Sequence, residues 1–343
     1  MDSAQLEVLE KQPLAFSSGG NNLVSATSRL PFVTADGSAV LNVECFFFED
    51  KENEPPLNLS PAPIILYVHG VCSSAETLGV QNIVSQAKKK NYRVTVLELE
   101  GHGFSSGARA VCGDFMRLVQ HVTEYVKHVL TTLSKQEKSR TIPFILCGNS
   151  LGGVLMSYAA DIISRSLAEY PGRFMGVALI APAVGVDKSA VPHPVAIGAL
   201  KIFSYLAPSA TVSLTPMEDP ISYASPKNST RNYHGHWPLA TSRMLFDVTN
   251  ETVKRDIQNG TLSMNKVNSL IIFAGEKDDI VPYEAVQEFH ESIGAREKAL
   301  INVPDAGHDL LYQAPFANEI VNQIFQWMEL RMWAVGRLNG TSP

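Results

Sequence analysis

One serine of the chain stands in a setting that favours nucleophilic chemistry. Ser150 is the central residue of Gly148-Asn149-Ser150-Leu151-Gly152, and the mostly apolar run from Pro143 to Cys147 precedes this motif. Apolar residues at helical spacing follow it, so the sequence predicts a strand, a sharp turn and a helix. The turn would place the serine hydroxyl at the carboxyl end of a buried strand, where the partial positive charge of a helix N-terminus favours a developing oxyanion. The pentapeptide alone is short and also occurs in ordinary connections, so its partners decide the interpretation.

A serine hydroxyl is a weak nucleophile at neutral pH and needs a base, which in turn needs an acid that orients it. Asp278 follows the apolar run Leu270 to Ala274, and His308 follows the run Ala299 to Val303. If both runs are parallel strands, the two side chains reach one edge of the sheet together with Ser150. A helix cap and a satisfied surface histidine are the structural alternatives, but the joint placement favours catalysis. The rival acids are Asp279, Asp305 and Asp309.

An oxyanion hole takes two backbone N–H donors, one from the residue after the nucleophile and one from the loop after an earlier strand. Leu151 supplies the first donor. The strand predicted at Ile64 to Val68 runs into His69-Gly70-Val71, and we expect the amide of Val71 to be the second donor. We expect His69 to be a hydrogen-bonded scaffold residue, because the reaction needs only one base.

The elements that must position these residues alternate between short apolar strands and amphipathic helices. Strands are expected at residues 64–68, 92–99, 144–147, 177–181, 270–274 and 299–303, and helices at 81–90, 114–133 and 320–332. This alternation is typical of an α/β fold with a mostly parallel sheet covered by helices on both faces. Asp36-Gly37 between two β-rich runs adds an antiparallel hairpin at the front edge of the sheet.

The composition is that of an ordinary globular protein and excludes several functional classes. The 343 residues are 45% hydrophobic and 18% charged, with a formal net charge of -6, which argues against a nucleic-acid partner or an anionic surface held by bulk electrostatics. The four cysteines lack paired metal spacing, so we expect free thiols in a reducing, cytoplasmic compartment. The serine chemistry described above calls for no metal or organic cofactor. Met1 to Gly20 has charges and no continuous apolar run, unlike a secretory signal.

The rhythm of strands and helices breaks between Ala181 and Leu270, where about ninety residues stand in place of a crossover of a dozen or so. We expect residues 183–245 to form a cap over the carboxyl edge of the sheet. Residues 29–182 and 246–335 would then form the core, and residues 1–28 and 336–343 would be flexible ends.

The cap segment from Val195 to Leu206 is apolar around most of a helix circumference. Two interpretations stay open: a helix buried between cap and core, whose Leu200, Phe203 and Leu206 would line an apolar acyl tunnel, and a lid surface that meets lipid. The two are compatible, because the inner face of a lid lines the substrate tunnel. Peripheral membrane contact through the cap is a further hypothesis.

Five motifs together carry a family resemblance: His69-Gly70, the segment 98–107, Gly148 to Gly153, Gly275-x-x-Asp278 and Gly307-His308. They resemble the monoacylglycerol lipase and lysophospholipase group of α/β-hydrolases, which also includes serine-aminopeptidase-like proteins. The order Ser150, Asp278, His308 is that of the α/β-hydrolases. Glu98 and Glu100 occupy positions at which this group has an aspartate and an arginine.

The resemblance implies an α/β-hydrolase fold with a helical cap and a serine hydrolase that cleaves carboxylic esters through an acyl-enzyme. The expected substrate is a monoacylglycerol or a lysophospholipid-type lipid, with Ser150 as nucleophile, His308 as base and Asp278 as the orienting acid. One triad serves many reactions, so a generic carboxylesterase, a thioesterase or an acyltransferase stays open. A non-catalytic hydrolase-like receptor is an alternative from another class, although all three triad residues are present.

Overall fold

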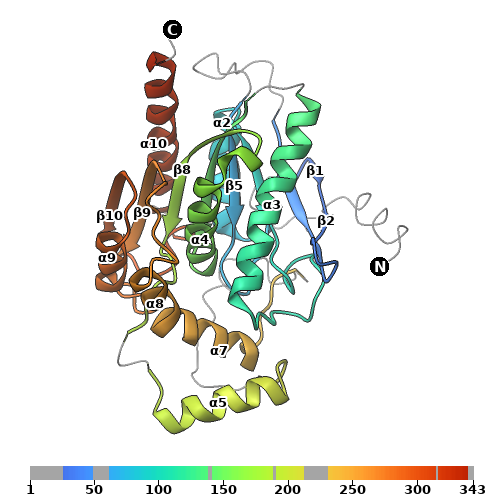
Figure 1. The fold of residues 1–343 in the computed structure, drawn as a ribbon, viewed down its shortest axis with the longest axis vertical. Helices are drawn as coiled ribbons and strands as arrows, with labels where there is room; N and C mark the ends of the chain where they lie inside the picture. The colour runs from blue at the N-terminus through green and yellow to red at the C-terminus, as the bar shows by residue number, and fades with distance from the viewer. Residues whose placement is uncertain are drawn as a thin grey trace.

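A sheet of eight strands lies at the centre of the part of the chain that the computed structural model describes, namely residues 26–48, 62–137, 141–187, 191–211, 231–313 and 316–338 (Figure 1). Its order is β1-β4-β6-β5-β7-β8-β9-β10. The strands are β1 (Ser28–Arg29), β4 (Val43–Phe46), β5 (Ile64–Val68), β6 (Arg93–Leu97), β7 (Pro143–Asn149), β8 (Arg173–Ile180), β9 (Ser269–Gly275) and β10 (Glu297–Val303). The pairs from β6 to β10 are parallel, which confirms the predicted α/β class.

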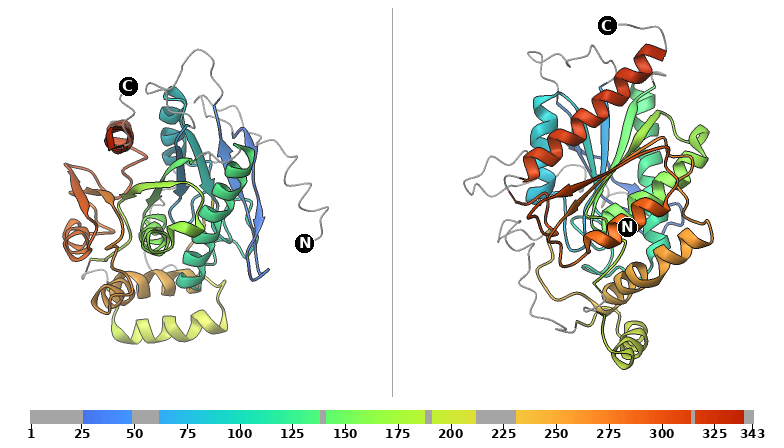
Figure 2. Two further views of the ribbon diagram at one scale, coloured as in Figure 1. Left: turned by 45° about the horizontal axis from the view of Figure 1, so that its top comes forward. Right: turned by 90° about the vertical axis from the view of Figure 1, so that its left-hand side faces the viewer.

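Helices cover both faces of this sheet, as the two views of Figure 2 show. Residues Ile64, Leu66 and Val68 of β5 belong to one hydrophobic core, together with side chains of α3 (Phe115–Gln136) and α4 (Leu151–Arg165). The alternate residues Ile65 and Tyr67 belong to a second core, with α2 (Leu78–Lys89) and α10 (Phe316–Leu338). Because successive side chains of a strand point to opposite faces, β5 is apolar along its whole length.

The front edge of the molecule is antiparallel, as the sequence predicts. Strands β2 (Phe32–Val33) and β3 (Val40–Leu41) form a separate hairpin, and Gly37 in its turn has a φ of 70°. Strand β4 then pairs antiparallel with β6 on one side and with β1 on the other. The hairpin at Asp36-Gly37 is therefore confirmed, but it forms a separate two-stranded sheet, and β1 and β4 supply the antiparallel edge of the eight-stranded sheet instead.

Among the described residues between β8 and β9, the helical elements are α5 (Pro194–Leu206), α7 (Leu239–Asp247), the π-helical turn η3 (Val248–Thr252) and α8 (Val253–Gln258). Helix α5 packs on α7 and lies farther from the sheet than α7 in every view (Figures 1 and 2). Residue 245, at which we expect the cap to end, falls inside α7. The limits of the cap stay a prediction.

The described part of the chain ends with helix α10. Helix α10 extends to Leu338, so the start of the expected tail at residue 336 belongs to this helix, and residues 1–25 and 339–343 lie outside the described residues. Helix α9 (Tyr283–Ser292) packs on β9 and β10. Among the described helices, none combines the length and the apolar character that crossing a membrane requires. The four cysteines, Cys45, Cys72, Cys112 and Cys147, are all free and buried.

Candidate active site

Ser150 lies at the turn between β7 and α4 in a backbone conformation that non-glycine residues rarely adopt. Its φ is 52° and its ψ is -118°, between the last residue of the strand and the first of the helix. A side chain at Gly148 would clash with the backbone of Gly152, and one at Gly152 would clash with the carbonyl of Val68. The two glycines therefore let strand and helix approach closely enough to hold the strained turn. The sharp turn predicted from the sequence is present.

The structure brings the three predicted triad side chains into one chain of hydrogen bonds. His308 Nε2 lies 2.9 Å from Ser150 Oγ, and His308 Nδ1 lies 2.8 Å from Asp278 Oδ2. Ser150 follows β7, Asp278 follows β9 and His308 follows β10, so all three stand at the carboxyl edge of the sheet. An ionised Asp278 accepts the Nδ1–H of the imidazole, which leaves Nε2 free to accept the serine O–H.

Asp278 is held on both carboxylate oxygens. Its Oδ1 atom accepts hydrogen bonds from the N–H groups of Ile280 (2.9 Å) and Val281 (2.8 Å), and its side chain is 1% exposed. Its Oδ2 atom is thereby directed toward the imidazole. Of the rival acids, Asp305 instead pairs with Lys277 at 2.5 Å and its side chain is 74% exposed. The carboxylate in contact with His308 is that of Asp278.

The charge of Asp278 sets the protonation behaviour of His308. Burial alone lowers the pKa of the imidazole, but the hydrogen bond and the charge of Asp278, with smaller contributions from Asp309 and Asp279, raise it above its ordinary value of 6.5. The imidazole can accept a proton from Ser150 only when it is neutral, that is, above this raised pKa. The His308 side chain is 10% exposed.

The loop after β5, residues 70–76, passes against the serine, and we call it the β5 loop. A Cβ at Gly70 would lie 3.3 Å from the Cβ of Ser150, so the backbone there is close to the nucleophile. Val71 is half-buried, and Leu151 is the first residue of α4 and fully buried. The structure thus places both predicted amide donors on the segments that flank Ser150. Their role in an oxyanion hole stays a prediction.

Two buried histidines form hydrogen bonds with the β5 loop and with the segment after β6, and both are uncharged. Leu99 N–H donates to Nε2 of His69 (3.2 Å), whose Nδ1–H donates to the Gly70 carbonyl (2.7 Å), and burial lowers the pKa of this imidazole. His69 is therefore a hydrogen-bonded scaffold residue, as expected. Similarly, the Cys72 N–H donates to Nε2 of His102 (3.0 Å), and burial, with a smaller contribution from His69, lowers the pKa of His102 to about 3. This role of His102 was not predicted, although Gly101-His102-Gly103 lies within the motif at residues 98–107.

The three residues predicted to line an acyl tunnel lie on the outer helix α5. Leu200 is half-buried, whereas Phe203 is 55% and Leu206 is 74% exposed. Helix α5 packs on α7, and α7 lies between α5 and the sheet (Figure 1). The contact of these three residues with substrate stays a prediction. In the described part of the chain, no group of three or more His, Cys, Asp or Glu side chains is arranged to hold a metal ion.

Known proteins resemble this chain in fold along most of its length. The structure of a monoacylglycerol lipase from Paleococcus ferrophilus aligns with a TM-score of 0.60 at 16% identity, over 85% of this chain and 99% of that one. A soluble variant of monoglyceride lipase from Saccharomyces cerevisiae aligns with a TM-score of 0.61 at 13% identity, over 93% and 98%. Both likenesses show the α/β-hydrolase fold.

Sequence relatives point to the same group. A monoacylglycerol lipase of Mycolicibacterium smegmatis is 23% identical over 275 residues, which are 78% of this chain and 88% of that protein. A monoglyceride lipase of Rattus norvegicus is 24% identical over 286 residues, 81% of this chain and 86% of that protein. The model of the family described as serine aminopeptidase, S33, matches residues 60–314, which include all three triad residues. The chain therefore belongs to the serine aminopeptidase S33 family of α/β-hydrolases.

Proposed function

We propose that this protein is a serine hydrolase that cleaves carboxylic esters through an acyl-enzyme. The observation that carries the proposal is the continuous hydrogen-bond chain from Asp278 through His308 to Ser150. Each group has the partner that its step requires, since a base contacts the nucleophile and a carboxylate orients the base. A structural role alone would not need a serine in a strained turn with an imidazole directed at its hydroxyl.

The reaction follows from this geometry. His308 removes the proton of Ser150 as the serine oxygen attacks the ester carbonyl, and Asp278 stabilises the imidazolium that forms. The amides of Val71 and Leu151 donate to the oxyanion of the tetrahedral intermediate. The C–O bond to the alcohol then breaks as His308 protonates the leaving oxygen. Water, deprotonated by the same imidazole, attacks the acyl-enzyme and releases the carboxylic acid and the free serine.

The substrate class we favour is a monoacylglycerol or a lysophospholipid-type lipid. Sequence relatives are named monoacylglycerol lipase and monoglyceride lipase, at 23 to 24% identity. The outer helix α5 is rich in exposed apolar side chains, which suit a long-chain substrate that is drawn from a lipid phase. A carboxylesterase, thioesterase or acyltransferase with the same triad would differ in the acyl group or in the acceptor.

Two measurements test this proposal. A fluorophosphonate probe should label the wild-type protein and leave Ser150→Ala unlabelled, because only an activated serine attacks phosphorus. Wild-type protein should then hydrolyse monoacylglycerols with long acyl chains faster than short p-nitrophenyl esters. Activity on short activated esters alone would reduce the proposal to a generic esterase, and labelling that persists in Ser150→Ala would refute the nucleophile.

We also propose that α5 contacts a membrane surface from the cytoplasmic side. Five of its side chains are large, apolar and exposed: Val195 (75%), Ile202 (61%), Phe203 (55%), Tyr205 (77%) and Leu206 (74%). The helix carries a single charged residue, Lys201, so the attraction would come from apolar burial. A reducing compartment such as the cytoplasm is consistent with four free, buried cysteines.

A further inference from the structure

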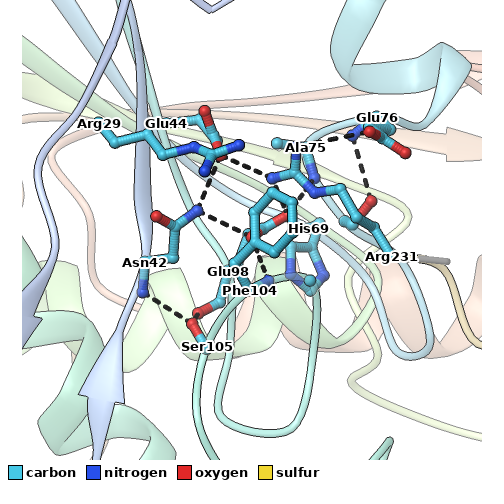
Figure 3. A network of polar contacts seen from close by, with 12 residues as sticks. Arg29, Asn42, Glu44, His69, Ala75, Glu76, Glu98, Phe104, Ser105 and Arg231 are labelled. Atoms are coloured by element: carbon cyan, nitrogen blue, oxygen red, sulfur yellow. Dashed lines mark hydrogen bonds and ion pairs between the residues drawn. The ribbon is translucent and has the colours of Figure 1, made fainter. Parts of the chain in front are cut away.

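Five charged side chains from distant parts of the chain meet beside the β5 loop and form a buried charge cluster: Arg29, Glu44, Glu76, Glu98 and Arg231 (Figure 3). Glu44 and Glu98 are fully buried, and Arg231 is 3% exposed. One nitrogen of Arg231, Nη2, lies 2.7 Å from Glu44 Oε1 and 2.6 Å from Glu98 Oε1. Arg231 thus joins the two buried carboxylates that would otherwise repel each other.

Aromatic stacking fixes the position of Arg231 further. Two guanidinium groups lie against the ring of Phe104, with the Arg231 carbon 4.1 Å and the Arg29 carbon 4.2 Å from its centroid. The carbonyl of Arg231 accepts a hydrogen bond from Arg109 at 2.6 Å. Because contacts hold both its side chain and its backbone, Arg231 is fixed in position and can in turn hold the residues next to it.

Glu98 connects Arg231 to the β5 loop. Its Oε1 atom, which pairs with Arg231, also accepts the N–H of Ala75 at 3.2 Å. Its Oε2 atom accepts the N–H of Phe104 at 2.7 Å. Burial raises the pKa of the Glu98 carboxyl, but the Arg231 charge and these hydrogen bonds outweigh burial and lower it overall. Glu98 is therefore a carboxylate, whose charge strengthens each of these bonds.

The segment 231–233, which we call the clasp, runs antiparallel to the β5 loop and contacts every second residue of it. Arg231 Nη1 lies 3.6 Å from Glu76 Oε1, Asn232 Oδ1 accepts the Ser74 hydroxyl at 2.7 Å, and the Tyr233 N–H donates to the Cys72 carbonyl at 3.2 Å. As the residue number rises in the clasp, that of its partner falls. The arrangement holds the β5 loop from Glu76 back to the residue next to Val71.

Cys72 is the residue of the β5 loop to which Tyr233 of the clasp donates a hydrogen bond. Its φ is 61°, a strained value for a residue with a side chain. Its N–H donates to His102 and its carbonyl accepts from Tyr233, so groups outside the loop hold the peptide units on both sides of it. Val71 precedes Cys72 directly, so the orientation of its amide depends on a backbone that the clasp keeps in a strained conformation.

We propose that Arg231 is a positioning residue for the oxyanion hole, because it anchors the clasp and Glu98, which together hold the β5 loop and the Val71 amide beside Ser150. This inference rests on the proposed function for its catalytic consequence. Arg231 does not touch the reacting atoms; it acts through the loop. Its loss should therefore weaken stabilisation of the transition state more than binding of the substrate.

The test compares Arg231→Lys with Arg29→Lys. A lysine keeps the charge, but its single ammonium cannot replace both guanidinium nitrogens, Nη2 against Glu44 and Glu98 and Nη1 against Glu76. For Arg231→Lys we expect kcat to fall about tenfold or more with KM within about twofold, and the affinity for a trifluoromethyl ketone ester analogue to fall in parallel. Arg29→Lys makes the same change in the same cluster, from strand β1, and should keep kcat within about twofold. Equal losses in both variants, or an unchanged kcat in Arg231→Lys, would overturn the proposal.

Two further measurements keep the test decisive. If Arg231→Lys does not fold, Asn232→Ala removes the acceptor of Ser74 and should lower kcat about threefold or more at unchanged KM; a kcat within about twofold of wild type overturns the proposal. Hydrogen exchange of amides 70–77 requires no ester hydrolysis, so it separates this inference from the proposed function. These amides should exchange faster in Arg231→Lys than in Arg29→Lys, and equal protection would contradict the positioning role.

Discussion

The proposed catalytic triad and the buried charge cluster are both hydrogen-bonded networks with charged groups in a largely apolar interior, yet they are built differently. In the triad, one carboxylate meets one imidazole, and the far end of the network is the hydroxyl of Ser150. In the cluster, Glu44, Glu98 and Arg231 are 3% exposed or less, and both carboxylates accept a hydrogen bond from Arg231. The hydrogen-bond chain of the triad therefore ends at a hydroxyl that can react, whereas the charged groups of the cluster pair with one another.

The difference concerns which groups can change their charge. Burial lowers the pKa of His308, but the hydrogen bond and the charge of Asp278 raise it overall, and an imidazole can both gain and lose a proton, as the proposed general base must. Arg231 is always protonated, and its neighbours raise its pKa further. The triad, whose proposed role is proton transfer, therefore contains a histidine. The cluster, whose proposed role is structural, contains an arginine. Substitutions in the triad should accordingly lower activity more than stability, and substitutions in the cluster should lower stability more than activity.

The largest effect is expected for Ser150→Ala. Removal of the nucleophile should lower kcat about 10⁵- to 10⁶-fold, because the remaining residues cannot form the acyl-enzyme. The melting temperature should stay close to that of wild type, since the alanine removes a partly exposed hydroxyl and keeps the turn. Steady-state hydrolysis and thermal unfolding of the same samples measure both. A stability loss as large as that of a core mutation would remove the contrast between the two networks.

Asp278→Asn should have the next largest effect. The amide still offers an oxygen to the N–H groups of Ile280 and Val281, but its NH₂ group faces His308 Nδ1 and favours the wrong tautomer. We expect kcat to fall about 10⁴-fold with the fold retained. Kinetic assays with circular dichroism as the control for folding provide the measurement. A loss of tenfold or less would mean that another acid orients the imidazole.

In the cluster, Arg231→Met should act mainly on stability. It leaves the buried Glu44 and Glu98 carboxylates without their shared cation, and breaking such a pair costs about 3–5 kcal/mol of unfolding free energy. The matched control is Lys201→Met, because Lys201 is 45% exposed and lies 3.9 Å from Asp247, and an exposed pair contributes about 1 kcal/mol or less. Urea unfolding curves compare the two variants. Similar midpoints would show that the cluster is not a stabilising network.

The pH dependence of kcat/KM should report the triad and not the cluster. His308 must be neutral to act as a base, so activity should be lost as the pH falls through its pKa, which lies above 6.5. Well below that pKa, the rate should drop about tenfold per pH unit. Removal of the Asp278 charge should move the inflection of the residual activity to lower pH. Rates of Asp278→Asn and wild type over the same pH range test this, and an unmoved inflection would assign it to a different group.

The smallest effect is expected on the outer helix. Phe203→Asp, at a side chain that is 55% exposed, should lower vesicle binding severalfold while hydrolysis of a short soluble ester stays within about twofold. Lys201→Asp on the same helix is the control for added negative charge. Co-sedimentation with phosphatidylcholine vesicles and an ester assay provide the two readouts. If vesicle binding and ester hydrolysis fell together, Phe203 would have a packing role in the cap.

Much of the fold followed from local sequence, because each strand and turn depends on neighbouring residues. Strand β5 was expected at Ile64 to Val68 and has these limits, and the glycines around Ser150 indicated the turn that the structure contains. The residues of the triad could be named because the carboxyl ends of parallel strands meet at one edge, so their order along the chain sufficed.

The buried charge cluster could not be predicted in this way. Arg231 is 133 residues from Glu98 and 187 residues from Glu44, and no periodicity connects positions so far apart. Helix α5 shows a second limit of local patterns: an apolar circumference indicates burial or contact with lipid, but does not say which neighbour covers the helix. The structure places α7 next to the sheet and α5 outside it.

The buried cysteines make site-specific labelling straightforward. Burial raises the pKa of the Cys45 and Cys112 thiols to about 12 each, and it raises that of Cys147 as well, so their reactive thiolate forms are scarce at neutral pH. Maleimide dyes should therefore prefer a cysteine introduced at an exposed position, such as Tyr205→Cys, which is 77% exposed in wild type. An environment-sensitive fluorophore could then be attached to α5 without first replacing any native thiol.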